Sequence, residues 1–153
     1  MAEPYECYRD GFLISTDPAR LDVSVIHGFL RTSYWSSNIP RTVVEKAIQH
    51  SLCFGLYADD RQIGFARVIS DHATFAYLAD VFVLEECRGR GLAIWLIECI
   101  RAHPDLRGLR RWLLATRDAH ALYRRFGFRE LAAPERSMEI HDPDVYSRAK
   151  GVE

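Results

Sequence analysis

The residues best suited to chemistry form an arginine- and glycine-rich run, Arg88-Gly89-Arg90-Gly91-Leu92-Ala93. The apolar stretch before it, residues 75–84, predicts a strand, and the one after it, residues 94–100, predicts a buried helix. Glycines allow backbone N–H groups to approach a ligand closely. A helix N-terminus adds unpaired donors and a partial positive charge. The run therefore predicts an anion site, and phosphate binds readily at such a site.

Two common phosphate motifs do not describe this run. No Gly-Lys-[Ser/Thr] follows the glycines, so it is not a P-loop. The Gly-x-Gly-x-x-Gly fingerprint of dinucleotide-binding folds is also missing, and the preceding strands are predicted to form a hairpin.

The elements that must position the run follow the order βααβββαβαββ. A strand is predicted at 11–15, a helix opening at Asp17-Pro18 and a second helix opening at Ile39-Pro40. The remaining predictions are strands at 52–58, 62–70 and 74–84, a helix to residue 102, a strand at 110–115, a helix at 118–126, strands at 128–131 and 137–140, and a tail over the last dozen residues. This pattern predicts one mixed α/β (α+β) domain over residues 1–153, with its core at about 11–140.

Composition narrows the class of protein. The chain has 153 residues, of which 48% are hydrophobic, as expected for one globular domain. No apolar run reaches membrane-spanning length, and the N-terminus has no signal pattern, so we expect no membrane partner. The four cysteines show neither a CxxC pair nor zinc-type spacing, which favours a reduced, cytoplasmic protein without a metal.

Charge is distributed unevenly along the chain. The net charge is -1, but residues 88–129 hold ten arginines and three acids. This asymmetry favours a polyanionic ligand for the second half, although a solvated arginine-rich surface would have the same pattern. Nucleic acid is not expected, since the protein is net acidic and the basic part has no nucleic-acid-binding motif.

The order of elements and two motifs resemble the GNAT superfamily of acetyl-CoA-dependent N-acetyltransferases. The phosphate loop of that family, [Arg/Gln]-x-x-Gly-x-[Gly/Ala], matches residues 88–93 in full. A second block, Asn-x-x-x-x-Tyr-x-x-x-Gly-Phe, has the same spacing from Asp118 through Tyr123 to Gly127-Phe128, with Asp in place of Asn. The resemblance covers residues 11–140 and is most specific for 79–128.

The resemblance implies a GNAT-like fold, a mostly antiparallel sheet with two strands splayed apart, and acetyl-CoA as co-substrate. The pyrophosphate would lie on the backbone of the 88–93 loop, and the pantetheine arm would run between strands 77–84 and 112–116. The predicted cofactor-binding residues are Val81, Phe82, Val83, Arg88, Gly89, Arg90, Gly91, Leu92, Ala93, Asp118 and Arg125.

Tyr123 is the predicted catalytic residue. Transfer of the acetyl group to an amine expels a thiolate, and a phenol with a pKa of ~10 can donate a hydrogen bond to it. In the family, a tyrosine at this position lies near the thioester sulfur. The alternative is a tyrosine that only packs against the helix of residues 91–102.

A general base is harder to assign. Strand alternation places Tyr77, Ala79, Val81 and Val83 on one face and Asp80 on the other. We therefore expect Asp80 to be a structural carboxylate rather than the base. His72, Asp71 and His120 could act through water but suit a plain surface role better.

Tyr34 and Trp35 join the two predicted N-terminal helices, where the family covers its acceptor site. Aromatic side chains in a polar loop suit a wall for a small molecule or an amine, and Tyr77 is predicted to contribute to the same site. Capping of the core is an equally good reading of Tyr34 and Trp35.

The sequence thus predicts an N-acetyltransferase that moves the acetyl group of acetyl-CoA directly to a primary amine of a small molecule or a peptide. It leaves the amine, the general base and a homodimer open. Two other functions compete: a non-catalytic acyl-CoA-binding module of the same fold, and a nucleotide-binding protein.

Overall fold

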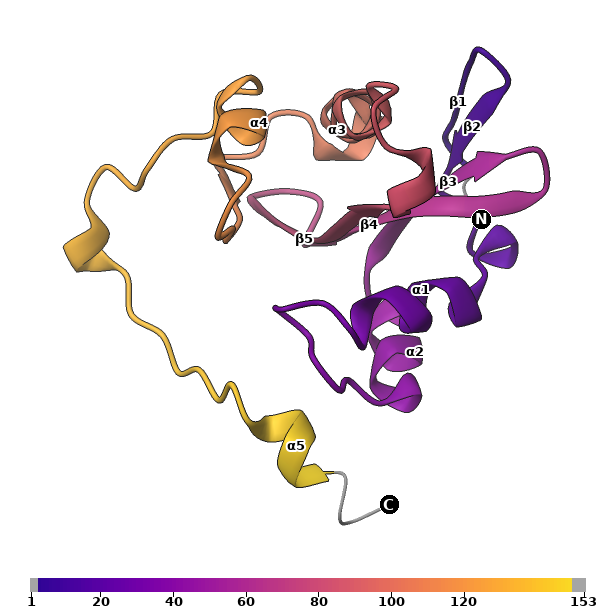
Figure 1. Ribbon diagram of the computed structural model, residues 1–153. Helices are drawn as coiled ribbons and strands as arrows, with labels where there is room; N and C mark the ends of the chain where they lie inside the picture. The colour runs from indigo at the N-terminus through magenta and orange to yellow at the C-terminus, as the bar shows by residue number, and fades with distance from the viewer. Residues whose placement is uncertain (1–2, 150–153) are drawn as a thin grey trace.

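A six-stranded mixed sheet organises the computed structural model, which describes residues 3–149 (Figure 1). The strands lie side by side in chain order, β1-β2-β3-β4-β5-β6, and all neighbours are antiparallel except β5 and β6, which are parallel. They span β1 (Glu6–Arg9), β2 (Phe12–Ser15), β3 (Leu52–Ala58), β4 (Arg61–Ser70), β5 (Phe75–Val83) and β6 (Arg111–Leu113).

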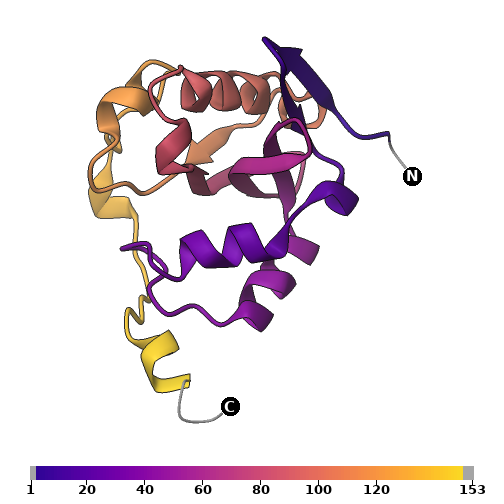
Figure 2. The ribbon, with the colours of Figure 1, turned by 45° about the vertical axis from the view of Figure 1, so that its right-hand side comes forward.

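Helices cover both faces of the sheet (Figures 1 and 2). One face carries α1 (Val23–Leu30) and α2 (Arg41–Gln49), and the other carries α3 (Leu92–Ala102). The other helical segments are α4 (His120–Arg124), α5 (Val145–Ala149) and the 3₁₀ turns η1 (Pro18–Arg20), η2 (Glu85–Cys87), η3 (Pro104–Leu106) and η4 (Pro134–Arg136). No helix among residues 3–149 is long and apolar enough to span a membrane. These elements confirm the predicted mixed α/β fold.

The sheet separates two hydrophobic cores. The core on the α3 face includes Phe54, Leu56 and Ile97, all fully buried. The core on the α1–α2 face includes Ile26 and Phe65, also fully buried. Alternate residues of β3, β4 and β5 therefore supply opposite cores, as a sheet with two covered faces requires.

The last two strands diverge, as predicted. β5 and β6 pair only at Phe75↔Arg111, Ala76↔Trp112 and Tyr77↔Leu113. β5 nevertheless continues to Val83, so six of its nine residues have no partner on the β6 side within the described part of the chain. This free edge of β5 runs from Leu78 toward the loop that leads into α3.

A β-bulge in β5 overturns the predicted orientation of Asp80. The pairing of β4 with β5 moves from Phe65↔Phe82 to Arg67↔Ala79, so Asp80 and Val81 together face a single residue of β4. Asp80 takes a left-handed conformation (φ 56°), which aspartate tolerates better than most residues.

The bulge resets the alternation of side chains along β5. Val81 and Val83 pack on the α3-side core, whereas Asp80 and Phe82 face the α1–α2 side. The prediction that Tyr77, Val81 and Val83 share one face, with Asp80 on the other, was wrong. It assumed an unbroken period of two, which the extra residue breaks.

The N-terminal elements differ from the predictions. Pro18 begins only the short turn η1, and α1 starts five residues later, at Val23. The Asp22 carboxylate explains this start, because it accepts hydrogen bonds from the N–H groups of Ser24 and Val25. The sequence also gave no sign of β1, which pairs with β2.

The C-terminal predictions were wrong in a similar way. Residues 128–131 and 137–140 form no strand, because no neighbour within the described part of the chain pairs with them. We call residues 129–144 the C-terminal arm, which extends away from the sheet (Figure 1). The predicted tail contains α5, whose Tyr146 packs on the α1–α2 core; residues 150–153 lie outside the described residues.

Candidate active site

The loop between β5 and α3 presents a row of free backbone donors. Gly89 (φ 85°) and Gly91 (φ 71°) adopt left-handed conformations, and Gly91 is the N-cap of α3 without a side-chain hydrogen bond. Within the described chain, no group accepts a hydrogen bond from the N–H groups of residues 89–94. The loop is exposed from Arg88 to Gly91. This geometry offers an anion several N–H donors at the positive end of a helix.

The two loop arginines differ in their surroundings. The Arg88 Nε donates a hydrogen bond to the carbonyl oxygen of Val83 at 2.9 Å, which ties the loop to the end of β5. Arg90 is exposed. Arg88 thus holds the loop in place. The sequence did not predict this contact with Val83.

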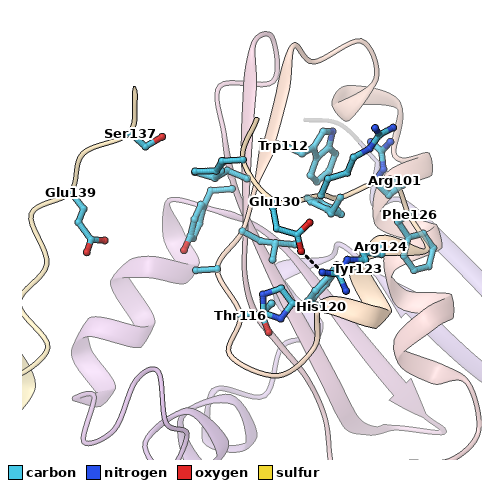
Figure 3. Close-up of a pocket in the computed structure, with 18 of the residues that line it drawn as sticks. Arg101, Trp112, Thr116, His120, Tyr123, Arg124, Phe126, Glu130, Ser137 and Glu139 are labelled. Carbon is cyan, nitrogen blue, oxygen red and sulfur yellow. Dashed lines mark hydrogen bonds and ion pairs between the residues drawn. The ribbon is translucent and has the colours of Figure 1, made fainter. Parts of the chain in front are cut away.

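A hollow of about 940 Å³ adjoins the last β5–β6 pair, Tyr77 and Leu113, and extends along the segment after β6, α4 and part of the C-terminal arm (Figure 3). Tyr77 and Tyr123 both line it, which brings two of the predicted site residues together. Its wall also includes Trp112, Leu113, Leu114, Thr116, His120, Ser137, Met138 and Glu139. The loop of residues 88–93 is not part of its wall.

Tyr123 is placed by α4 and is only 9% exposed. Its ring packs edge-on against Phe128, with the ring centroids 5.8 Å apart. Among residues 3–149, no group forms a hydrogen bond with its hydroxyl. Burial raises the pKa of Tyr123 to about 12, with smaller contributions from Tyr34 and Asp118. The phenol is therefore fully protonated at neutral pH and free to donate a hydrogen bond.

Tyr34 connects the α1–α2 loop to the segment that follows β6. Its hydroxyl accepts a hydrogen bond from the backbone N–H of Arg117 at 3.0 Å. The Arg117 guanidinium lies 3.8 Å from the centroid of the Tyr34 ring, a cation–π contact. These contacts fix the α1–α2 loop beside the hollow, on the same side as Tyr123.

Trp35 is held by a partly buried ion pair. Its indole Nε1 donates to Asp80 Oδ1 at 2.9 Å, and the Arg67 Nε donates to Asp80 Oδ2 at 2.8 Å. The side chains of Arg67 and Asp80 are 18% and 9% exposed. Both carboxylate oxygens of Asp80 are thus occupied, and the aspartate positions the aromatic wall formed by Tyr34 and Trp35.

The remaining predicted residues stand apart from this cluster. Asp118 and Arg125 are exposed, and neither forms an ion pair with any described residue. Val81 to Val83 lie on the free edge of β5, and their side chains enter the two cores.

The sequence analysis did not identify two residues that hold the aromatic wall, Arg67 and Arg117. Arg67 is the only charged residue between 62 and 70, a largely apolar stretch, and this signal could have indicated a buried partner. Arg117 gave no such signal, because it lies among many exposed arginines and its contact with Tyr34 spans 83 positions.

The chain belongs to the GNAT family of acetyltransferases. Residues 49–130 match the acetyltransferase (GNAT) domain family, which covers the sheet from β3 onward, the loop, α3 and α4. A protein of Gibberella zeae that carries the name "Putative acetyltransferase FG08082" is 30% identical over 154 aligned positions, covering 85% of this chain and 86% of that protein.

Solved structures agree with this assignment. A crystal structure of a GNAT-family protein from Xanthomonas campestris pv. campestris is 53% identical, with a TM-score of 0.87, and covers 89% of this chain and 96% of that one. A GNAT family acetyltransferase from Elizabethkingia anophelis, solved with acetyl-CoA bound, shares the fold at 12% identity, with a TM-score of 0.62 and coverage of 88% and 90%.

Proposed function

We propose that this protein is an N-acetyltransferase that transfers the acetyl group of acetyl-CoA directly to a primary amine. The observation that carries the proposal is the Tyr123 hydroxyl, protonated and without a hydrogen-bond partner in the described chain, on a hollow beside the last residue pair of β5 and β6. A free phenol at this point is suited to protonate a leaving thiolate.

The surroundings fit acetyl-CoA in two respects. The free N–H groups of residues 89–94 suit the pyrophosphate. The unpaired β6-side edge of β5, up to Val83, offers backbone groups to an extended pantetheine arm. The acetyl-CoA bound by the Elizabethkingia protein supports this assignment at the level of the fold.

The reaction forms one bond and breaks another. The neutral amine attacks the thioester carbonyl, a C–N bond forms, the C–S bond breaks, and the sulfur leaves with the electron pair. Tyr123 donates a proton to that sulfur, and the proton lost by the amine restores the phenol through solvent. The backbone N–H groups of β5 polarise the carbonyl oxygen. Positioning of the two substrates is the main contribution of the protein.

The acceptor site in this proposal is the aromatic wall beside the hollow. Tyr34 and Trp35 are about two-fifths exposed despite their fixed geometry, so their faces are available to an incoming amine. Tyr77 lines the hollow and completes the proposed acceptor site. Asp80 is a positioning residue in this scheme, since Arg67 and Trp35 occupy its oxygens.

The direct test is the release of free thiol from acetyl-CoA across a panel of primary amines, with the acetylated product identified by mass. We expect amine-dependent release of one thiol per acetylated amine. If CoA binds by calorimetry but no amine stimulates thiol release, the fold serves as a non-catalytic acyl-CoA-binding module instead. Stabilisation by ATP or NAD equal to that by CoA would favour a nucleotide-binding protein.

A further inference from the structure

Arg117 carries a guanidinium on the proposed acceptor side whose own hydrogen-bond donors are unused. Its Cζ lies 3.8 Å from the centroid of the Tyr34 ring. At that distance the planar guanidinium must lie nearly parallel to the ring, because an edge-on approach would push its nitrogens into the ring carbons. The N–H groups of a guanidinium lie in its own plane, so this stacking does not consume them. Within the described chain, none of them donates a hydrogen bond.

The positive charge of Arg117 is not compensated. The side chain is exposed and forms no ion pair with any described residue. Asp118 follows it in the chain without pairing. The α1–α2 loop, residues 31–40, contains an arginine and no acidic residue. The carboxylate that contacts the aromatic wall, Asp80, is occupied by another arginine and by an indole. The wall therefore presents an unneutralised positive charge.

Arg117 is also fixed relative to the proposed reaction centre. Its backbone N–H donates to the Tyr34 hydroxyl at 3.0 Å, so its backbone and its side chain both hold the same aromatic residue. Tyr34 contacts Trp35 with the ring centroids 5.1 Å apart, and it lies close enough to Tyr123 to raise the pKa of that phenol. The guanidinium is thus held on a ring that lies beside the proposed proton donor, which is the preorganisation that recognition of a substrate group needs.

We propose that Arg117 determines specificity, and that the acceptor is an amine that also carries a carboxylate, in the simplest case an amino acid. The carboxylate accepts two parallel N–H bonds from the guanidinium, while the amine of the same molecule attacks the thioester beside Tyr123. A second ammonium group on the acceptor would be repelled, which disfavours polyamines. This inference rests on the proposed function and adds the class of amine that the site selects.

The test compares acceptors that differ only in the carboxylate: glycine, β-alanine and L-phenylalanine, each against its amide. The readout is kcat/KM from thiol release. The amine pKa differs within each pair, so the decisive quantity is the acid-to-amide ratio of the wild type divided by that of Arg117→Gln, in which this difference cancels. We expect a quotient of about 5–15, between the values for an exposed ion pair and for a hydrogen bond to a charged group. The change should lie in KM, with kcat constant, and added salt should reduce it.

Arg110→Gln is the matched control. Arg110 is also exposed and forms no ion pair with a described residue, but it directly precedes β6, whereas Arg117 follows that strand. Its variant should keep the wild-type acid-to-amide ratio. CoA affinity, measured by calorimetry, should be equal in the wild type and both variants.

Three results would overturn the inference. A quotient close to one would mean that Arg117 acts only by packing, because acids and amides would then lose activity alike. Weaker CoA binding in Arg117→Gln would assign the guanidinium to the cofactor instead. Acetylation restricted to amines without a carboxylate would exclude the proposed substrate class. All three leave amine-dependent thiol release intact, whereas failure of every amine to release thiol would overturn the proposed function itself.

Discussion

The proposed cofactor side and the proposed acceptor side of this site are built by different means. The loop between β5 and α3 uses backbone N–H groups from one short segment, residues 89–94. The acceptor side uses side chains that are far apart in sequence: Trp35 and Asp80 are 45 positions apart, and Tyr34 and Arg117 are 83 apart. The comparison indicates that the chain can vary its acceptor side by single substitutions while the backbone-built cofactor side stays the same.

The largest effect is expected at Tyr123, where the two sides meet. Tyr123→Phe removes the hydroxyl and keeps the ring against Phe128, so the fold should persist. Turnover should fall by about 10²–10⁴-fold, the usual contribution of a positioned general acid. Acetyl-CoA affinity, measured by calorimetry, should change little, because the contact matters in the transition state. Wild-type turnover, measured where chemistry limits the rate, would remove Tyr123 from the mechanism.

The next effect tests the cofactor side alone. Gly91→Val places a β-branched residue at φ 71°, where strain of ~1–3 kcal/mol should weaken CoA binding by about 10–100-fold. Gly11→Val is the matched control, since Gly11 also has a positive φ (83°) and open space around its Cα but lies in the β1–β2 turn. Equal CoA affinity in the two variants, measured by calorimetry, would contradict the placement of the pyrophosphate.

Asp80→Asn tests the acceptor side. Asparagine tolerates the left-handed backbone and can still accept from Trp35, but it leaves the Arg67 charge without a counterion. We expect a loss of ~1–3 kcal/mol in unfolding free energy and a higher KM for the amine, with CoA affinity unchanged. In the control, Glu86→Gln at the exposed pair with Arg61, the loss should be much smaller, because solvent screens that pair. A decrease in CoA affinity together with the increase in the KM for the amine would show that the two sides are not separable.

A smaller effect concerns the exposed charge of Arg125. If this side chain faces the 3′-phosphate, dephospho-CoA should bind about two- to fivefold more weakly than CoA, the range for one exposed ion pair. Added salt should reduce the difference, and Arg125→Gln should abolish it. Equal binding of both cofactors at low salt would show that this arginine is only solvated.

The smallest effect concerns turnover at alkaline pH, which should stay constant as the pH rises. Burial raises the pKa of Tyr123 to about 12, so the phenol stays protonated well above neutral pH. Turnover measured from about pH 8 to about pH 10, where an unperturbed tyrosine would begin to ionise, should not fall. The same shift lowers the stability of the folded protein as the pH rises above about 10, because only the unfolded chain then ionises this tyrosine freely. A rate that declines with an apparent pKa near 9 would point to another proton donor.

The sequence predicted what depends on local pattern. The 88–93 loop, the hairpin of β3 and β4, and the spacing from Tyr123 to Phe128 each occupy one short segment, and the structure places them as expected. The orientation of Asp80 could not be predicted, because a bulge depends on the pairing of two strands and leaves no mark in the alternation of β5. The contact between Tyr34 and Arg117 depends on the tertiary fold. The strands expected at 128–131 and 137–140 failed because a strand exists only beside a partner.

The bulge in β5 also divides the strand into two stretches whose side-chain alternation is offset by one residue. Before Asp80, odd-numbered positions lie on the α1–α2 side of the sheet; from Asp80 onward, even-numbered positions do. Deletion of the extra residue would restore one unbroken alternation and leave both halves of the strand on their present faces. It would also remove the carboxylate that holds Trp35 and Arg67. An insertion or deletion elsewhere in β5 would instead turn part of the strand to the opposite face of the sheet. The bulge is therefore the point in β5 where the length of the strand can change without inverting a face.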